Sequence, residues 1–233
     1  MKAGIMQPYF FPYIGYWQLM NAVDVYVIYD DVNYIKRGWI NRNRILINGS
    51  PHFFNLPVCG ASQNKRICEI RVNHDERLVR KNLTALKLNY GKAPYFDKVY
   101  PLLERILQCR KTNLTEYLRE SIEGISSYLD IHTKLLQSSS LKKDDRLKGE
   151  EKVLDICRIL GADTYINAAG GRGLYSSLRF KEQGIQLYFL ETGDIRYRQA
   201  GDSFYENLSI IDVMMFNSKE DIKVMLEKYT LAL

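Results

Sequence analysis

The fold is decided near the start of the chain, where residues 3–31 read AGIMQPYFFPYIGYWQLMNAVDVYVIYDD. Residues 3–6 and 23–29 form two short runs typical of β-strands. The segment between them contains prolines and a glycine, followed by a helical stretch near residues 16–21. This order of strand, turn, helix and strand predicts the first unit of a parallel α/β sheet.

The last third of the chain repeats this alternation. The expected elements are a helix at 150–160 that ends at Gly161, a strand at 164–167, a glycine-rich loop at 170–173, a helix at 176–183 and a strand at 185–190. Alternating helices and strands at both ends of the chain favour one α/β fold to which both ends contribute.

The middle of the chain has a different pattern. Residues 44–47 and 52–58 flank Asn48-Gly49, which is a strong signal for a β-hairpin, and residues 67–72 can add another strand. From residue 74 to 137, apolar residues recur at helical spacing, with expected helices around 78–88, 99–107 and 114–136. The polar stretch 138–149 is expected to be a surface loop, in preference to a hinge or an active-site loop.

These patterns predict an α/β protein with a Rossmann-like parallel sheet built from both ends of the chain. A β-hairpin and a helical middle section are inserted between them. We expect a single domain over residues 1–233, with 74–137 as a helical subregion packed on the sheet.

Composition excludes several classes of protein. The chain has 233 residues, of which 46% are hydrophobic, enough for a core without disulfides. Its four cysteines form no Cys-x-x-Cys pair, which favours reduced cytosolic thiols over a disulfide or zinc scaffold. Residues 3–23 are uncharged, but their prolines and polar side chains argue against a membrane span or signal peptide. The expected location is therefore the cytoplasm.

Positive charge is concentrated in one part of the chain. Residues 36–92 contain twelve basic and three acidic side chains, although the whole chain carries only +6. Aromatic residues such as Tyr34, Trp39 and Phe53 lie among these charges. The combination suits a phosphate-bearing ligand whose base or sugar stacks on an aromatic ring. A solvated basic surface is an equally weighted alternative.

The first turn is the main candidate for a binding site. It places Gln7, Tyr9, Tyr13, Gly15 and Tyr16 between a strand and a helix N-terminus, where exposed N–H groups favour an anion. The turn resembles the His-x-Gly-His turn of nucleotidylyltransferases, with tyrosines in place of both histidines. Because tyrosine carries no positive charge, that charge would have to come from other residues, for which the candidates are Lys36, Arg37, Arg42 and Arg44. The alternative is an aromatic turn that only packs on the core.

A second candidate site follows the strand that ends at residue 29. Asp31 is the predicted general base, with Asp30 as its substitute and His52 as a weaker candidate. The phosphate-binding side chains expected beside them are Asn33, Lys36, Arg37, Asn41 and Arg42. A solvated loop with internal ion pairs is the alternative interpretation.

Two further features carry weaker signals. Gly170, Gly171 and Arg172 can wrap a phosphate, or can form a tight turn that requires positive φ. Asp212 is expected near a helix start capped by Ser209, where a structural role is at least as strongly favoured as a catalytic one. No histidine or cysteine has metal-ligand spacing, so no metal site is predicted.

Four strings in order resemble the WbqC-like family: MQPYFFPYIGYW at 6–17, DDVNYIKRGWINRN at 30–43, GADTY at 161–165 leading to Gly170-Gly171, and NLSIID at 207–212. The resemblance covers nearly the whole chain. It implies a role in bacterial surface-polysaccharide biosynthesis, such as O-antigen or lipopolysaccharide pathways, beside enzymes that make nucleotide-linked amino sugars.

The resemblance and the residues together lead to one main hypothesis, a transferase that forms an amide on the amine of a nucleotide-linked amino sugar. Its second substrate would be an activated acyl or aminoacyl donor, with RNA involved only as an aminoacyl carrier. No cofactor is firmly implied, and ATP is needed only if the acyl group is adenylated on the enzyme. The alternatives are a nucleotidylyltransferase acting on a sugar phosphate and a non-catalytic protein that binds RNA or an anionic glycan.

Overall fold

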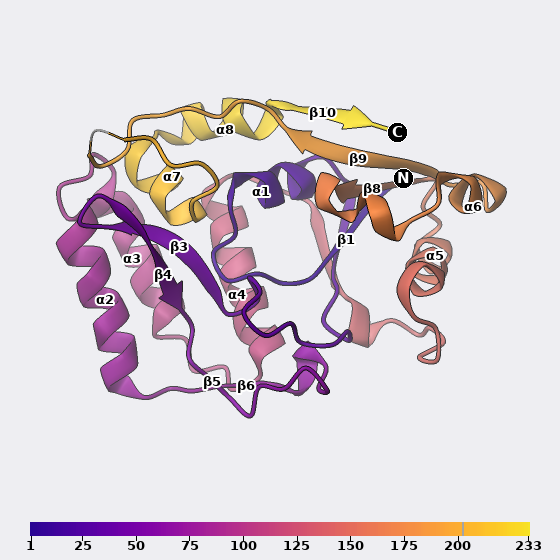
Figure 1. Ribbon diagram of the computed structural model, residues 1–233, viewed down its shortest axis with the longest axis horizontal. Coiled ribbons are helices and arrows are strands. Elements are labelled where there is room, and N and C mark those ends of the chain that lie inside the picture. Colours follow the sequence, from indigo (N-terminus) through magenta and orange to yellow (C-terminus); the bar gives the residue numbers. More distant parts are fainter. Residues whose placement is uncertain (202) are drawn as a thin grey trace.

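The computed structural model describes residues 1–201 and 203–233, and its centre is a six-stranded sheet in the order β10-β9-β8-β1-β2-β7 (Figure 1). Its strands are β1 (Lys2–Met6), β2 (Val25–Ile28), β7 (Lys134–Gln137), β8 (Thr164–Ala168), β9 (Gln186–Thr192) and β10 (Tyr229–Ala232). Neighbouring strands are parallel, except that β10 pairs with β9 in antiparallel fashion. The predicted Rossmann-like α/β class is therefore confirmed.

The order of the strands marks a switch point in the sheet. From β1 the chain adds β2 and then β7 on one side, and it later places β8 and β9 on the other side of β1. In open α/β sheets of this kind, ligands bind outside the carboxyl ends of the strands at the switch point. The segments that follow β1, β8 and β9 are thus the first places to look for a site.

Helices cover both faces of the sheet because successive strand residues point to opposite sides. Ala3, Ile5, Val25 and Val27 belong to a core that includes residues of α5 (Gly149–Leu160) and α6 (Ser177–Glu182). On the other face, the larger core includes residues of α1 (Ile14–Asn21), α7 (Ile210–Phe216) and α8 (Lys219–Glu227). Trp17 on α1 is completely buried there. The predicted helix end at Gly161 is confirmed, with a left-handed φ of 68°.

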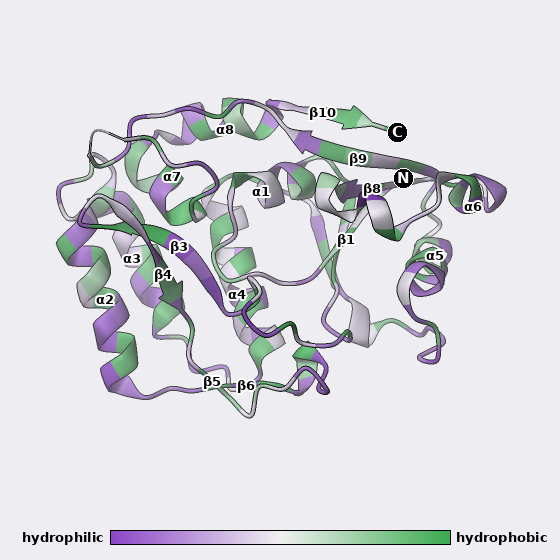
Figure 2. Cartoon of the chain, in the orientation of Figure 1, coloured by the Kyte–Doolittle hydropathy of each residue, from purple (hydrophilic) through white to green (hydrophobic). Residues whose placement is uncertain are grey.

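The inserted middle section begins with the predicted hairpin, formed by β3 (Arg42–Ile47) and β4 (Ser50–Asn55). Its turn residues Asn48 and Gly49 have φ values of 50° and 74°, as an Asn-Gly hairpin turn requires. Three helices follow, α2 (Glu76–Tyr90), α3 (Phe96–Leu107) and α4 (Leu114–Tyr128). Hydrophobic and hydrophilic residues alternate around α2, as expected of a helix with one packed face (Figure 2).

Two predicted elements of this section are confirmed only in part. The expected helix at 114–136 ends at Tyr128, and its last part is strand β7, which pairs with β2. Asp130, with a φ of 60°, breaks the helix before the strand begins. Residues 67–72 form a 3-10 turn (Ile67–Glu69) and the two-residue strand β6 (Arg71–Val72), which pairs with β5 (Val58–Cys59) outside the main sheet.

Candidate functional site

The turn after β1 is held in an uncommon backbone conformation. Phe11 has a φ of 44°, which is rare for an aromatic residue because its Cβ crowds the backbone. The carbonyl oxygen of Phe11 accepts hydrogen bonds from Asn43 Nδ2 at 2.9 Å and from Ser209 Oγ at 2.8 Å. Segments distant in the sequence therefore fix this turn, which is a common arrangement where a site needs a defined shape.

Backbone contacts hold the turn on two further sides. Phe10 N donates to the carbonyl of Trp39 at 3.1 Å, and Ile210 N donates to the carbonyl of Pro12 at 3.0 Å. The Pro12 carbonyl also accepts a hydrogen bond from the indole of Trp17 at 3.1 Å. The turn, the hairpin and the start of α7 thus form one rigid unit.

Two adjoining pockets lie beside this unit. The small pocket has a volume of about 220 Å³ and is lined by Tyr9, Tyr13, Trp39, Asn43, Arg44 and Asn207. The large pocket has a volume of about 450 Å³, and its lining includes Tyr13, Thr192, Asp194, Tyr197, Glu206 and Asn207. Tyr13 and Asn207 belong to both. Tyr13 follows the carboxyl end of β1 and Asp194 follows that of β9, so the large pocket lies at the edge of the sheet where open α/β proteins bind ligands.

The tyrosines of the turn are suited to donate hydrogen bonds. Burial raises the pKa of Tyr13, and burial together with the neighbouring Tyr13 raises the pKa of Tyr9. Both hydroxyls therefore stay protonated at neutral pH. Ile14, the first residue of α1, also lines the large pocket, so the positive end of that helix contributes to it.

The other residues predicted in this turn have structural contacts. The carbonyl oxygen of Gln7 accepts a hydrogen bond from Tyr16 Oη at 3.3 Å, and the Tyr16 side chain is buried. A Cβ at Gly15 would lie 2.4 Å from Thr192 Oγ1 and 2.5 Å from the Tyr13 ring. Gly15 is therefore needed so that α1 can pack closely on β9. It does not serve to bring a ligand close to the backbone.

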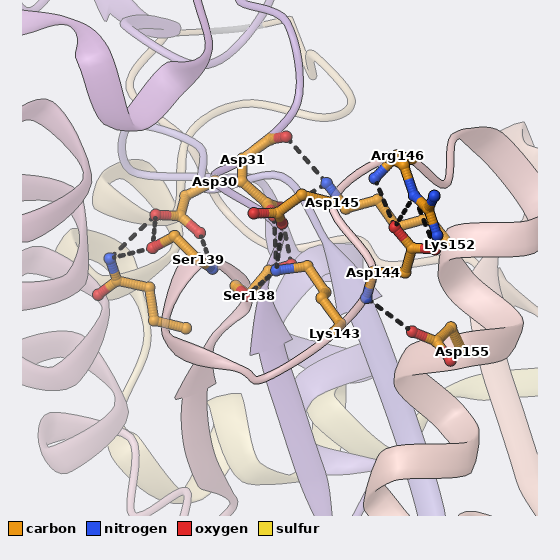
Figure 3. Close-up of polar contacts among 11 residues, drawn as sticks. Asp30, Asp31, Ser138, Ser139, Lys143, Asp144, Asp145, Arg146, Lys152 and Asp155 are labelled. Atoms are coloured by element: carbon orange, nitrogen blue, oxygen red, sulfur yellow. Dashed lines mark hydrogen bonds and ion pairs between the residues drawn. The ribbon is translucent and has the colours of Figure 1, made fainter.

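The two predicted catalytic aspartates lie in a closed cluster, drawn in Figure 3. Asp30 accepts hydrogen bonds from Gln137 Nε2 at 2.9 Å and from Ser139 N at 2.9 Å and Oγ at 2.7 Å. Asp31 forms ion pairs with Lys143 at 2.7 Å and Lys152 at 2.9 Å, and its side chain is 2% exposed. Neither aspartate lines the pockets described above.

This environment makes Asp31 a poor general base. Burial alone would raise the pKa of its carboxyl group, but hydrogen bonds from Lys143, Lys152 and Ser138 outweigh burial and lower the pKa. A carboxylate held by two ammonium groups has little tendency to accept a further proton. The expectation that Asp30 and Asp31 face the same crevice as the turn is therefore corrected. The 138–149 segment, expected to be a surface loop, closes over them instead.

The predicted phosphate-binding residues are scattered. Lys36, Arg37 and Asn33 are exposed, and none of them lines the two pockets. Asn41 Oδ1 accepts from Tyr34 Oη at 2.6 Å, while its Nδ2 donates to the carbonyl of Leu56 at 3.0 Å. These contacts leave Asn41 with a structural role in the hairpin.

Arg42 and His52 also lie outside the pockets. Arg42 Nε donates to the carbonyl of Gly38 at 3.1 Å, and its guanidinium lies 4.1 Å from the centre of the Phe53 ring. His52 is exposed on β4 opposite Ile45. Neither residue contacts the aspartate cluster among the interactions of the described residues.

The glycine-rich segment after β8 is a 3-10 helix, Ala169–Leu174, with no positive φ at Gly170 or Gly171. A Cβ at Gly171 would lie 2.5 Å from Asn167 Nδ2, so this glycine is needed for close packing, and the expected tight turn with positive φ is wrong. Arg172 forms an ion pair with Glu191 at 2.8 Å. No residue of this segment lines either of the two pockets.

The sequence singles out Asp212, but it does not show that this acid is completely buried near the large pocket. Asp212 accepts hydrogen bonds of 2.8 Å from both Tyr90 Oη and Tyr197 Oη. Burial raises the pKa of Asp212 to about 6, although both tyrosines act in the opposite direction. The predicted cap is present, since Ser209 Oγ accepts from Ile211 N at 3.2 Å. Because Tyr197 lines the large pocket, Asp212 holds one wall of it in place.

Comparison with known proteins gives a family match over most of the chain. The WbqC-like protein family matches residues 7–224. The chain is 30% identical over 219 residues to an uncharacterized protein, Rv1507c, of Mycobacterium tuberculosis (strain ATCC 25618 / H37Rv), covering 93% of each chain. No solved structure matches it. Across residues 1–201 and 203–233, the structure contains no helix with the length and apolar content of a membrane span. With a match over most of its length, the chain belongs to the WbqC-like protein family.

Proposed function

We propose that the protein is a transferase that forms an amide on the amine of a nucleotide-linked amino sugar, in O-antigen or other surface-polysaccharide biosynthesis. The observation that carries the proposal is the pair of adjoining pockets at the strand ends, in which aromatic side chains, an arginine and two carboxylates come together. Trp39, 41% exposed, offers a ring on which a base or sugar can stack. A site of this composition suits an aromatic, phosphate-bearing molecule.

In this proposal the large pocket holds the reacting amine. Asp194 and Glu206 are the carboxylates among the described residues that line it, and Asp194 is already paired with Arg196 at 3.1 Å. We therefore assign the general base to Glu206 and not to Asp31. The amine nitrogen attacks the acyl carbonyl carbon, the bond from that carbon to its carrier breaks, and the amine proton passes to Glu206.

The donor is an activated acyl or aminoacyl group, and RNA enters only as a possible carrier of an aminoacyl group. ATP is required if the enzyme first adenylates the acyl group, with Tyr9 and Tyr13 as the available hydrogen-bond donors of the turn. The proposal includes a cytoplasmic location, with which the four free cysteines are compatible.

Calorimetry with UDP- and dTDP-linked amino sugars, each with and without ATP, tests the proposal directly. We expect binding of at least one nucleotide-linked amino sugar by the wild-type protein, and weaker binding of the matching sugar without its amine. The absence of binding to every nucleotide sugar tested would reject the proposal. Release of pyrophosphate from a nucleoside triphosphate without an amine acceptor would favour a nucleotidylyltransferase instead.

A further inference from the structure

The guanidinium of Arg44 is incompletely satisfied in the small pocket. Its Nη2 donates to the carbonyl oxygens of Glu206 at 3.2 Å and Asn207 at 3.5 Å. Its Nε is buried and has no hydrogen-bond partner. A charged group whose buried donor lacks a partner within the protein is unfavourable, so the Arg44 guanidinium gains from an acceptor that enters the pocket it lines.

The described carboxylates, over residues 1–201 and 203–233, do not supply that acceptor. Within the described residues, no Asp or Glu lies within ion-pair distance of Arg44, whereas Arg172 pairs with Glu191 at 2.8 Å and Arg179 with Glu150 at 3.0 Å. A guanidinium presents several donors in one plane, a geometry that matches phosphate oxygens. Arg44 therefore carries positive charge that the described part of the chain leaves available to a ligand.

The neighbouring arginines are less suited to this task. Arg42 lies two residues away on β3, but its Nε is bonded to the carbonyl of Gly38 and its guanidinium stacks on Phe53. Arg37 is exposed and lines neither pocket. Arg44 differs from both because it lines the small pocket beside Tyr9, Tyr13 and Trp39.

We infer that Arg44 is the phosphate-binding side chain of the site, and that the small pocket takes the phosphate or diphosphate of a nucleotide. The hydroxyls of Tyr9 and Tyr13 can add neutral donors to the same oxygens, and Trp39 can stack on the attached ring. The choice of a nucleotide rests on the proposed function, whereas the anion site rests on Arg44 and the pocket alone.

The inference also gives the substrate a direction. Arg44 lies at the small pocket, and the carboxylates of Asp194 and Glu206 lie at the large one, which adjoins it through Tyr13 and Asn207. A molecule with a phosphate at one end and an amine at the other complements this separation of charge. The phosphate end is thereby placed at Arg44, and the amine is placed in the adjoining large pocket, where Glu206 meets Arg44 through its backbone carbonyl.

Tryptophan fluorescence provides the test, because the chain has only two tryptophans and Trp17 is fully buried. Wild-type protein is titrated with inorganic pyrophosphate, UMP and UDP, and Trp39→Phe identifies the source of the signal. The same titrations use Arg44→Gln, Arg44→Lys and the matched control Arg42→Gln. Thermal unfolding of each variant checks that it is folded.

We expect pyrophosphate and UDP to bind the wild type, and Arg44→Gln to weaken UDP binding by about 10- to 100-fold, as loss of hydrogen bonds to a charged group implies. Arg44→Lys should retain part of the UDP affinity. If Arg44→Gln does not fold, Arg44→Lys decides the result, because it should still bind UDP more weakly than Arg42→Gln does. Arg42→Gln should bind UDP within a few-fold of wild type.

Failure of pyrophosphate and UDP to bind the wild type would overturn the inference. So would weakened binding in Arg42→Gln with unchanged binding in the Arg44 variants. If UDP binds in an Arg44-dependent way but no amino-sugar nucleotide is recognised through its amine, the anion site stands and the proposed function fails. The two conclusions can therefore be separated.

Discussion

The carboxylate of Asp31 lies 2.7 Å from the ammonium group of Lys143, and both side chains are almost completely removed from solvent. Lys152 approaches the same oxygen at 2.9 Å and also donates to the carbonyl of Asp31 at 3.0 Å. Three ionised groups thus share a closed space at the end of β2. Each of these charges is tolerated in the interior only because the opposite charge is beside it, since a single buried charge is costly.

Replacing Asp31 with Asn should therefore destabilise the fold. The substitution leaves Lys152 buried without its counter-charge and Lys143 with only Asp145, at 3.8 Å, and breaking a buried ion pair typically costs about 3–5 kcal/mol. Urea unfolding of the variant measures the loss. Asp144→Asn is the matched control, since its partner Arg146 is 90% exposed and the pair should contribute little. A variant of Asp31 that is as stable as wild type but inactive would restore the general-base interpretation.

Asp212 should make stability depend on pH in the opposite sense from an ordinary ion-paired carboxylate. Its pKa is raised from 3.8 to about 6 by burial, so the folded state holds the proton more tightly than the unfolded state. Stability should therefore fall as the pH rises from about 4 to about 6, by about 3 kcal/mol, and then level off. Urea unfolding at pH 4.5 and 7.5 should show about 2 kcal/mol of this change, because Asp212 is already partly ionised in the unfolded state at pH 4.5.

Asp212→Asn removes the titrating group and should abolish that slope, so the variant gains stability relative to wild type as the pH rises. The two tyrosine hydroxyls keep an amide to bond with. An unchanged slope in the variant would mean that another group is responsible.

The sequence predicts local structure well where short-range chemistry decides it. Asn48-Gly49 fixes a hairpin through its backbone conformation, and Gly161 ends α5 in the left-handed region. Strand β7 escaped prediction because Leu135 and Leu136 continue the helical spacing of α4. The short connection 129–133 separates the two elements, and its one residue with positive φ, Asp130, is a weak signal for a helix end.

The candidate site shows the same limit at longer range. Tyr9 and Tyr13 could be predicted because they follow a strand and precede a helix in one short stretch. The environment of Asp31 could not, because Lys152 is 121 residues away in the sequence. Arg44 was one of four equivalent cations until the fold placed it in a pocket. Charge in a sequence indicates a ligand class, but only tertiary contacts decide which charges remain available.

Gly15→Ala should disturb the large pocket. Its Cβ would lie 2.4 Å from Thr192 Oγ1 and 2.5 Å from the ring of Tyr13, and both residues line that pocket. Overpacking of this kind costs about 1–3 kcal/mol and should also weaken ligand binding. Gly170→Ala is the control, because nothing lies within 4 Å of its Cβ position. Equal unfolding midpoints for the two variants would contradict the close approach of α1 to β9.

Glu206→Gln tests the assignment of the general base. The variant keeps the shape of the side chain and the backbone carbonyl that accepts from Arg44, but its amide cannot accept a proton from the amine. Turnover should fall by about 10²- to 10⁴-fold, because a general base acts in the transition state, while UDP affinity should stay within a few-fold of wild type. Steady-state rates across pH with an amino-sugar nucleotide and its donor provide the measurement. Wild-type turnover in Glu206→Gln would exclude this residue as the base and shift the assignment to Asp194, the other described carboxylate in the large pocket.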